Sequence, residues 1–169
     1  LLESVAMELH SQAFETLGDA EKQAVREDAE ERYISYAFLR QSGTQHGNLK
    51  VDLQNDFLPG GALAVPDGDA VIPVANKLQA MFPLVVATQD WHPANHKSFA
   101  ANHPGRSPGE VIRLKKSSQI LWPIHCVQNT RGAELAPGLS LSRINKIFKK
   151  GMDPEIDSYS AFFDNGHEQ

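Results

Sequence analysis

The sequence predicts an α/β domain with a parallel sheet over residues 48–169, preceded by a helical segment. Residues 84–88 form an apolar run without polar alternation, which is typical of a parallel strand covered on both faces. Residues 68–82 come before it and carry an apolar stripe at helical spacing from Ile72 to Met81. Strand and helix in alternation indicate a parallel α/β sheet.

The first part of the chain, residues 1–47, is predicted to be a helical extension with a linker. Apolar residues recur at helical spacing over residues 2–17 and 19–41, and Gly18 is expected to end the first of these helices. A polar, glycine-containing linker follows over residues 41–48. This part holds nine acidic and four basic side chains, against twelve of each in the remainder, so the net charge of −5 belongs to it.

Two further short strands are expected in the domain of residues 48–169, at residues 49–53 and 144–148. The approach to the first, residues 44–51, is too polar for a strand buried on both faces, so we expect that strand to be short.

The composition excludes several classes of protein. At 41% hydrophobic and 22% charged residues it is ordinary for a globular domain, and no apolar run approaches the roughly 18 residues that span a bilayer. No basic patch suggests nucleic-acid binding. The single cysteine, Cys126, excludes an internal disulfide and favours a reducing compartment, so we expect a cytoplasmic protein.

A carboxylate and three imidazoles follow the apolar runs, namely Asp90, His92, His96 and His125. Residues two apart in an extended chain point the same way, so Asp90 and His92 can face one point. Such a set suits zinc, iron or manganese. A single histidine is more often a hydrogen-bonded or surface residue, but the crowding of these side chains favours a metal site.

Polar side chains also fall at the carboxyl ends of three predicted strands: Asp52, Asp90 and Lys150. Taken alone, Asp52 would be a loop carboxylate or a helix cap, and Lys150 a solvated lysine. Ligands of open parallel sheets bind at these strand ends, so we expect the three residues to meet in one site.

Several motifs in order resemble one known family. They are Asp52-Leu-Gln-Asn-Asp-Phe57, Gly60-Gly-Ala-Leu-Ala-Val-Pro66, Asp90-Trp-His-Pro-Ala-Asn-His96, Trp122-Pro-Ile-His-Cys-Val-Gln128, Lys150-Gly151 and Asp157-Ser-Tyr-Ser-Ala-Phe-Phe-Asp-Asn165. Over about residues 51–169 the chain closely resembles the nicotinamidases (pyrazinamidases) of the isochorismatase-like hydrolases. The resemblance implies a three-layer α/β/α fold, here in an incomplete copy.

The resemblance also implies an activity, the hydrolysis of nicotinamide to nicotinate and ammonia in NAD salvage, with pyrazinamide as a related substrate. Asp52 would act as the base and Lys150 as the cation of an Asp–Lys–Cys triad. Phe57 and Trp122 would flank the pyridine ring, although each alone would be an ordinary core aromatic. The metal, zinc first and iron or manganese as alternatives, would be held by Asp90, His92 and His125, with His96 as a fourth ligand or a group behind them.

One departure from the family bears on activity. The family's nucleophile follows a Gly-x-Ala-Thr-Asp-x-Cys motif that this sequence lacks, and Cys126 is expected to be a small packing residue. We therefore expect this chain to be inactive by itself, and we allow for a homo-oligomer. The alternative is a non-catalytic metal-binding or ligand-binding protein, or a helical interaction protein that carries a degenerate hydrolase fragment.

Overall fold

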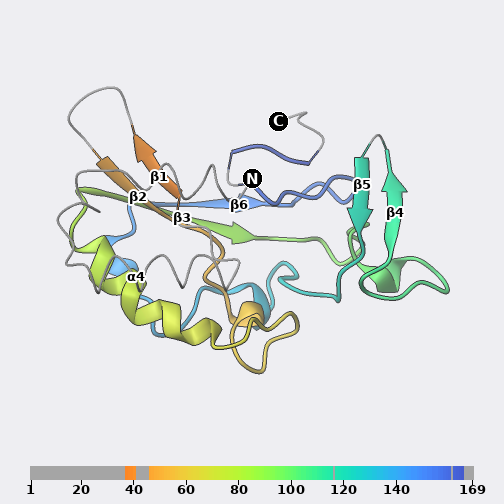
Figure 1. Cartoon of the computed structure of the whole chain (residues 1–169), viewed down its shortest axis with the longest axis horizontal. Helices are drawn as coiled ribbons and strands as arrows, with labels where there is room; N and C mark the ends of the chain where they lie inside the picture. The colour runs from red at the N-terminus through yellow and green to blue at the C-terminus, as the bar shows by residue number, and fades with distance from the viewer. Residues whose placement is uncertain (1–36, 41–45, 116, 161, 166–169) are drawn as a thin grey trace.

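The computed structural model describes residues 37–40, 46–115, 117–160 and 162–165. A four-stranded sheet in the order β1–β2–β3–β6 lies beside a separate β4–β5 hairpin (Figure 1). The strands are β1 (Ala37–Arg40), β2 (His46–Lys50), β3 (Leu84–Asp90), β4 (Val111–Leu114), β5 (Ser117–Ile120) and β6 (Lys146–Lys150). The described helices are α4 (Val71–Gln79) and short 3-10 turns at Asn55–Phe57, Gly68–Ala70, Ala100–Asn102, Arg131–Ala133 and Leu141–Arg143.

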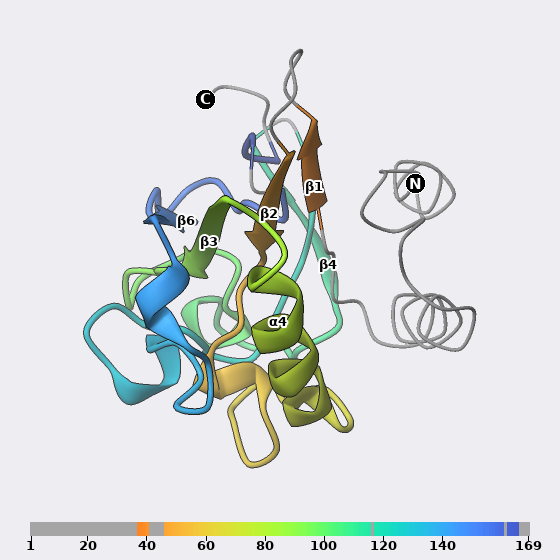
Figure 2. The same cartoon turned by 90° about the vertical axis from the view of Figure 1, so that its left-hand side faces the viewer.

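The centre of the sheet is parallel, as the sequence predicts. Strand β2 pairs with β3 and β3 pairs with β6, both in parallel, while β1 adds an antiparallel strand at the far edge. Helix α4 connects β2 to β3 and lies beside β2 in both views of the molecule (Figure 2). The α/β class is therefore confirmed, and the carboxyl ends of β2, β3 and β6 lie along the same side of the sheet.

The apolar stripe of α4 forms the core beneath the sheet. Ala75 is fully buried, and Ile72 and Leu78 are buried on the same stripe, with Leu53 and Leu139 packed against the helix. The helix is shorter than the predicted span of residues 68–82. It ends at Gln79, and Met81 lies beyond that end with 43% of its surface exposed.

Strand β2 lies a few residues earlier than predicted. The extended chain stops at Lys50 rather than at Leu53, because Asp52 adopts a left-handed conformation with φ of 51° that a strand cannot accommodate. The expectation that the polar approach could not be a buried strand is also wrong, since residues 47–50 are buried. This burial is unfavourable, because neither polar atom of the Asn48 amide has a hydrogen-bond partner among the described residues.

The other two parallel strands are predicted as strands, but their predicted bounds differ from those in the structure. Strand β3 continues past Thr88 to Asp90, and β6 covers Lys146–Lys150 rather than residues 144–148. Their register pairs Asp90 with Lys150, so both strands end at one level. The β4–β5 hairpin, in which Val111 lies opposite Ile120, was not predicted.

The predicted helix over residues 19–41 is wrong at its end. Ala37–Arg40 is strand β1, which pairs with the edge of β2 that would otherwise be open. The expected helices over residues 1–36 lie outside the described residues, so the division at residues 47 and 48 stays a prediction. None of the helices in the described part has the length and hydrophobicity that crossing a bilayer requires.

Candidate active site and metal centre

The ends of the parallel strands bring two carboxylates to one ammonium group. Asp52 follows β2, Asp90 ends β3 and Lys150 ends β6. The Nζ of Lys150 lies 2.7 Å from Asp52 Oδ2 and 2.5 Å from Asp90 Oδ1, and it also donates to the backbone oxygen of Ser158 at 2.7 Å. The fold thus brings Asp52, Asp90 and Lys150 together, as the sequence predicts.

Burial and charge set different pKa values for the two carboxylates. Burial, together with the charge of Asp90, raises the pKa of Asp52 to about 6, although Lys150 opposes the shift. Burial acts to raise the pKa of Asp90 too, but the Lys150 ammonium and the His92 ring outweigh it and hold that pKa below its usual range. For Lys150, burial acts to lower the pKa, yet the two carboxylates raise it above its usual value. Of the pair, Asp52 is therefore the carboxylate suited to accept a proton.

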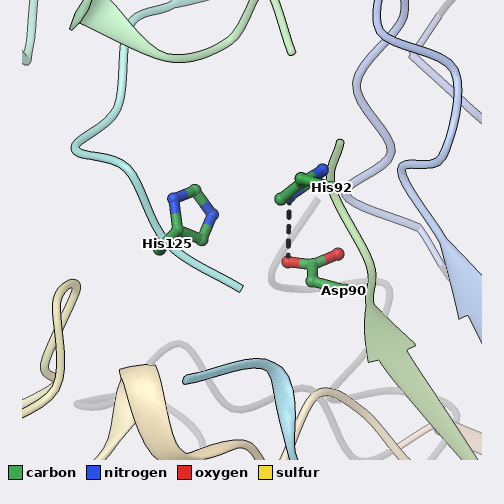
Figure 3. A group of neighbouring side chains, drawn as sticks. All are labelled: Asp90, His92 and His125. Carbon is green, nitrogen blue, oxygen red and sulfur yellow. Dashed lines mark ion pairs between the residues drawn. The ribbon is translucent and has the colours of Figure 1, made fainter. Parts of the chain in front are cut away.

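Beside this group lie the donor atoms of a metal site. Asp90, His92 and His125 are all buried, and their ligand atoms lie within 4.8 Å of one another (Figure 3). Asp90 Oδ2 is 3.7 Å from His92 Nε2, as the dashed line in Figure 3 marks. Two imidazoles and a carboxylate match a site for a divalent transition metal.

Both imidazoles carry their protons on the nitrogen that faces away from this site. His92 Nδ1 is 2.8 Å from the backbone oxygen of Gly151, and His125 Nδ1 is 2.7 Å from that of Pro123. A carbonyl oxygen can only accept, so each Nδ1 must be the donor and each Nε2 of a neutral ring holds a lone pair. Second-sphere bonds of this kind orient metal-binding histidines. The residues present therefore fit a divalent metal.

His96 occupies a different position from the one expected of a ligand beside Asp90. It is buried, and its Nδ1 accepts from the backbone N–H of Ser98 at 3.2 Å, which leaves Nε2 to donate to Ile156 O at 3.3 Å. Its ligand atoms group with those of His92 and Asp157 instead. This arrangement favours His96 as a support behind His92, and its role as a ligand stays a prediction. Asp157 was not among the predicted site residues.

The two predicted aromatic residues lie close to the site in different ways. The Phe57 ring is 5.8 Å from the His125 ring, centroid to centroid. Trp122 packs edge-on against Tyr159, and its Nε1–H donates to the Tyr159 hydroxyl at 3.1 Å. Tyr159 is a neighbour of Trp122 that the sequence pattern gave no reason to select.

Cys126 faces the interior. It is fully buried, its backbone adopts φ of 46°, and its N–H donates to Asp56 Oδ2 at 2.7 Å. Burial, together with the negative charges of the nearby carboxylates, raises the pKa of its thiol far above the usual value. Such a thiol is a poor source of thiolate, in keeping with the expected packing role.

Two neutral residues that sequence reasoning missed bond to the two aspartates, one to a carboxylate and one to a backbone. The Thr88 hydroxyl donates to Asp52 Oδ1 at 2.7 Å and accepts from the Asp52 N–H at 3.2 Å. The Gln54 side chain bonds to the backbone of Asp90. Each stands two residues from an aspartate in the sequence, but only the folded structure shows that Thr88 bonds to Asp52 and Gln54 to Asp90.

The parallel α/β sheet, with a carboxylate–lysine group and a His–His–Asp set of potential metal ligands at its strand ends, agrees with the isochorismatase-like fold that the sequence motifs predict. No protein-family model matches the chain. It is 54% identical over 125 residues to a nicotinamidase of Escherichia coli (strain K12), over 72% of this chain and 58% of the relative. It thus belongs to the nicotinamidase family over that part of its length, and it spans about 58% of the length of that relative.

Solved structures agree with this assignment. An Acinetobacter baumanii nicotinamidase/pyrazinamidase matches with a TM-score of 0.70 and 53% identity, over 71% of this chain and 58% of that chain. The pyrazinamidase of Pyrococcus horikoshii, solved in complex with zinc, matches with a TM-score of 0.54 and 42% identity, over 68% of this chain and 56% of that chain.

Proposed function

We propose that the chain carries the base and the metal centre of a nicotinamidase, which hydrolyses nicotinamide to nicotinate and ammonia. The observation that carries the proposal is the Lys150 bridge between Asp52 and Asp90, directly beside the buried His92 and His125. The 54% identity to a curated nicotinamidase supports the choice of substrate. The same identity disfavours the alternative of a non-catalytic or helical interaction protein.

Each residue of the group has a role in amide hydrolysis. With a pKa of about 6, Asp52 is mostly ionised at neutral pH and can take the proton of a thiol. The thiolate would attack the carboxamide carbon and expel ammonia, and water would then release the acid and regenerate the thiol. Lys150 keeps the two carboxylates ionised at close range and supplies positive charge beside the forming thiolate.

The metal and the aromatic residues would position the substrate. Asp90, His92 and His125 would hold a divalent metal, and we take zinc as the first candidate because the Pyrococcus horikoshii relative binds it. When bound, the metal would supply a Lewis acid for the pyridine nitrogen. Phe57 and Trp122 would flank the ring, and pyrazinamide, which has a similar ring, would be accepted as well.

The nucleophile of this proposal lies outside residues 1–169. Cys126 is the single cysteine of the sequence, and its thiol is buried with a strongly raised pKa. A reactive thiolate needs a partly exposed, electropositive setting. We also propose that the protein acts in the cytoplasm and forms a homo-oligomer.

Ammonia release from nicotinamide tests the proposal. The zinc-loaded chain alone should release none, whereas the chain extended with the C-terminal segment of the Escherichia coli relative should turn over. Asp52→Asn or Lys150→Met in the extended chain should each lower kcat at least 100-fold, because a base or its cation is lost. Activity of the chain alone that Cys126→Ala abolishes would instead make Cys126 the nucleophile.

A further inference from the structure

The backbone of Asp90 faces a gap in the sheet. Pairing between β2 and β3 ends at Lys50 and Ala87, while β3 runs on to Asp90. The N–H of Trp91 points to the β6 side, where it donates to Lys150 O at 2.9 Å. Successive residues of a strand direct their backbone N–H and C=O groups to opposite sides. Those groups of Asp90 therefore point away from β6, to the side where β2 has already ended.

Backbone pairing on that side begins again at His92. The His92 N–H donates to Cys126 O at 3.0 Å, and its oxygen accepts from Gln128 N–H at 2.9 Å. Between the end of β2 and this contact, no backbone group in the described part of the chain bonds to the N–H or C=O of Asp90 on that side. A buried peptide group without a partner would be costly.

The side chain of Gln54 closes this gap. Its Nε2 donates to Asp90 O at 2.8 Å and its Oε1 accepts from the Asp90 N–H at 2.7 Å. The second hydrogen of Nε2 goes to Ala133 O at 2.8 Å, and the side chain is completely buried. Carbonyl oxygens can only accept, so the orientation of the amide is fixed by its partners.

We propose that Gln54 is a positioning residue that substitutes for a peptide group of the missing strand and thereby holds Asp90 in register. Asp90 donates no other backbone bond on this side, yet its carboxylate must face both Lys150 and the two histidines. An amide is the side-chain group that offers a donor and an acceptor at the spacing of a peptide. The link to metal binding rests on the proposed function, whereas the link to the backbone of Asp90 does not.

Gln89 provides a matched control. It is a buried glutamine next to Asp90 in the sequence, and its Nε2 donates to the same Ala133 oxygen at 2.8 Å. Replacing Gln89 by Met therefore removes the bond to Ala133 and leaves the Gln54–Asp90 pair intact. Gln54→Met removes the bond from Gln54 to Ala133 together with the Gln54–Asp90 pair.

Amide hydrogen exchange in the metal-free chain tests the positioning role. In Gln54→Met the Asp90 amide should exchange at least 10-fold faster than in the parent, whereas in Gln89→Met it should stay within about 3-fold. Zinc affinity, measured by competition with a chromophoric chelator, should fall about 10- to 100-fold in Gln54→Met, as is typical when a second-sphere bond to a ligand is lost. Gln89→Met should bind zinc as the parent does.

The outcomes separate the two levels of the proposal. Failure of the parent chain to bind zinc would refute the metal centre and leave the exchange result standing. Equal effects of Gln54→Met and Gln89→Met, in exchange or in affinity, would overturn the special role of Gln54. Gln54→Glu keeps the length and one acceptor and should bind zinc as weakly as Gln54→Met. Unfolding of both Gln54 variants, with Gln89→Met folded, would show a folding role and overturn positioning.

Discussion

Within the described part of the chain, the buried ammonium group of Lys50 forms no ion pair with a carboxylate. It is 1% exposed, and its Nζ donates to Ala75 O at 2.7 Å. Burial lowers its pKa to about 8, from an ordinary value of 10.5. The charged form is therefore less favourable in the folded chain than in the unfolded chain.

Replacing Lys50 by Met should stabilise the fold by roughly 3 kcal/mol at pH 7, the free energy that corresponds to a pKa lowered from 10.5 to about 8. Below pH 8 the parent bears the whole cost of the buried charge. As the pH rises from 8 towards 10.5 the parent loses the proton and regains stability, so the advantage of Lys50→Met should fade. Urea unfolding at pH 7 and pH 10 measures both effects, and an advantage independent of pH would contradict the explanation.

At the scale of elements, β6 is an edge strand with apolar side chains on both faces. Ile147 is 41% exposed and Phe148 is 45% exposed, and within the described residues the strand pairs with β3 alone. Parallel strands are usually covered on both sides, and an open apolar edge favours association with other chains.

A charge at this edge should reduce association. Phe148→Lys is expected to shift the chain towards monomer and to lower its tendency to aggregate, as followed by size-exclusion chromatography with light scattering. Ile120→Lys places the same charge on the β4–β5 hairpin, where Ile120 is 38% exposed, and should have less effect. If the two variants associated to the same extent, the surface responsible for association would lie elsewhere than on β6.

The elements also show where sequence reasoning succeeds. Residues 84–88 are apolar without alternation, and this pattern is enough to identify a parallel strand and the level at which Asp90 emerges. Strand β1 was assigned to a helix because Ala37 and Phe38 fit helical spacing, and only its pairing with β2 decides otherwise. The left-handed turn at Asp52 likewise depends on its contact with Thr88, which is 36 residues away.

At the scale of the whole molecule, metal binding should couple segments that are distant in the sequence. His92 follows β3, whereas His125 lies in the loop after β5, so a shared ion would tie the two together. Ligands that bind only the folded state stabilise it, by about 2.7 kcal/mol at 100 times the dissociation constant.

Zinc should therefore raise the Tm of the chain, and His92→Ala should abolish both the rise and the bound metal found by elemental analysis. His103→Ala is the control, because His103 bonds to Lys97 O and belongs to neither group of potential ligands. Metal retained in His92→Ala would place the ion elsewhere.

Gly151 lies between the Lys150–carboxylate group and the metal-ligand group, and it has no side chain that could belong to either. It follows Lys150, its backbone has φ of 63°, and any Cβ there would collide with the His92 ring. Its oxygen fixes that ring from behind. A saturation library at this position, scored by zinc binding, should thus tolerate glycine alone, although glycine has no side chain that could bind the metal. Such intolerance would report the space that the His92 ring needs, and not a chemical role of Gly151 itself.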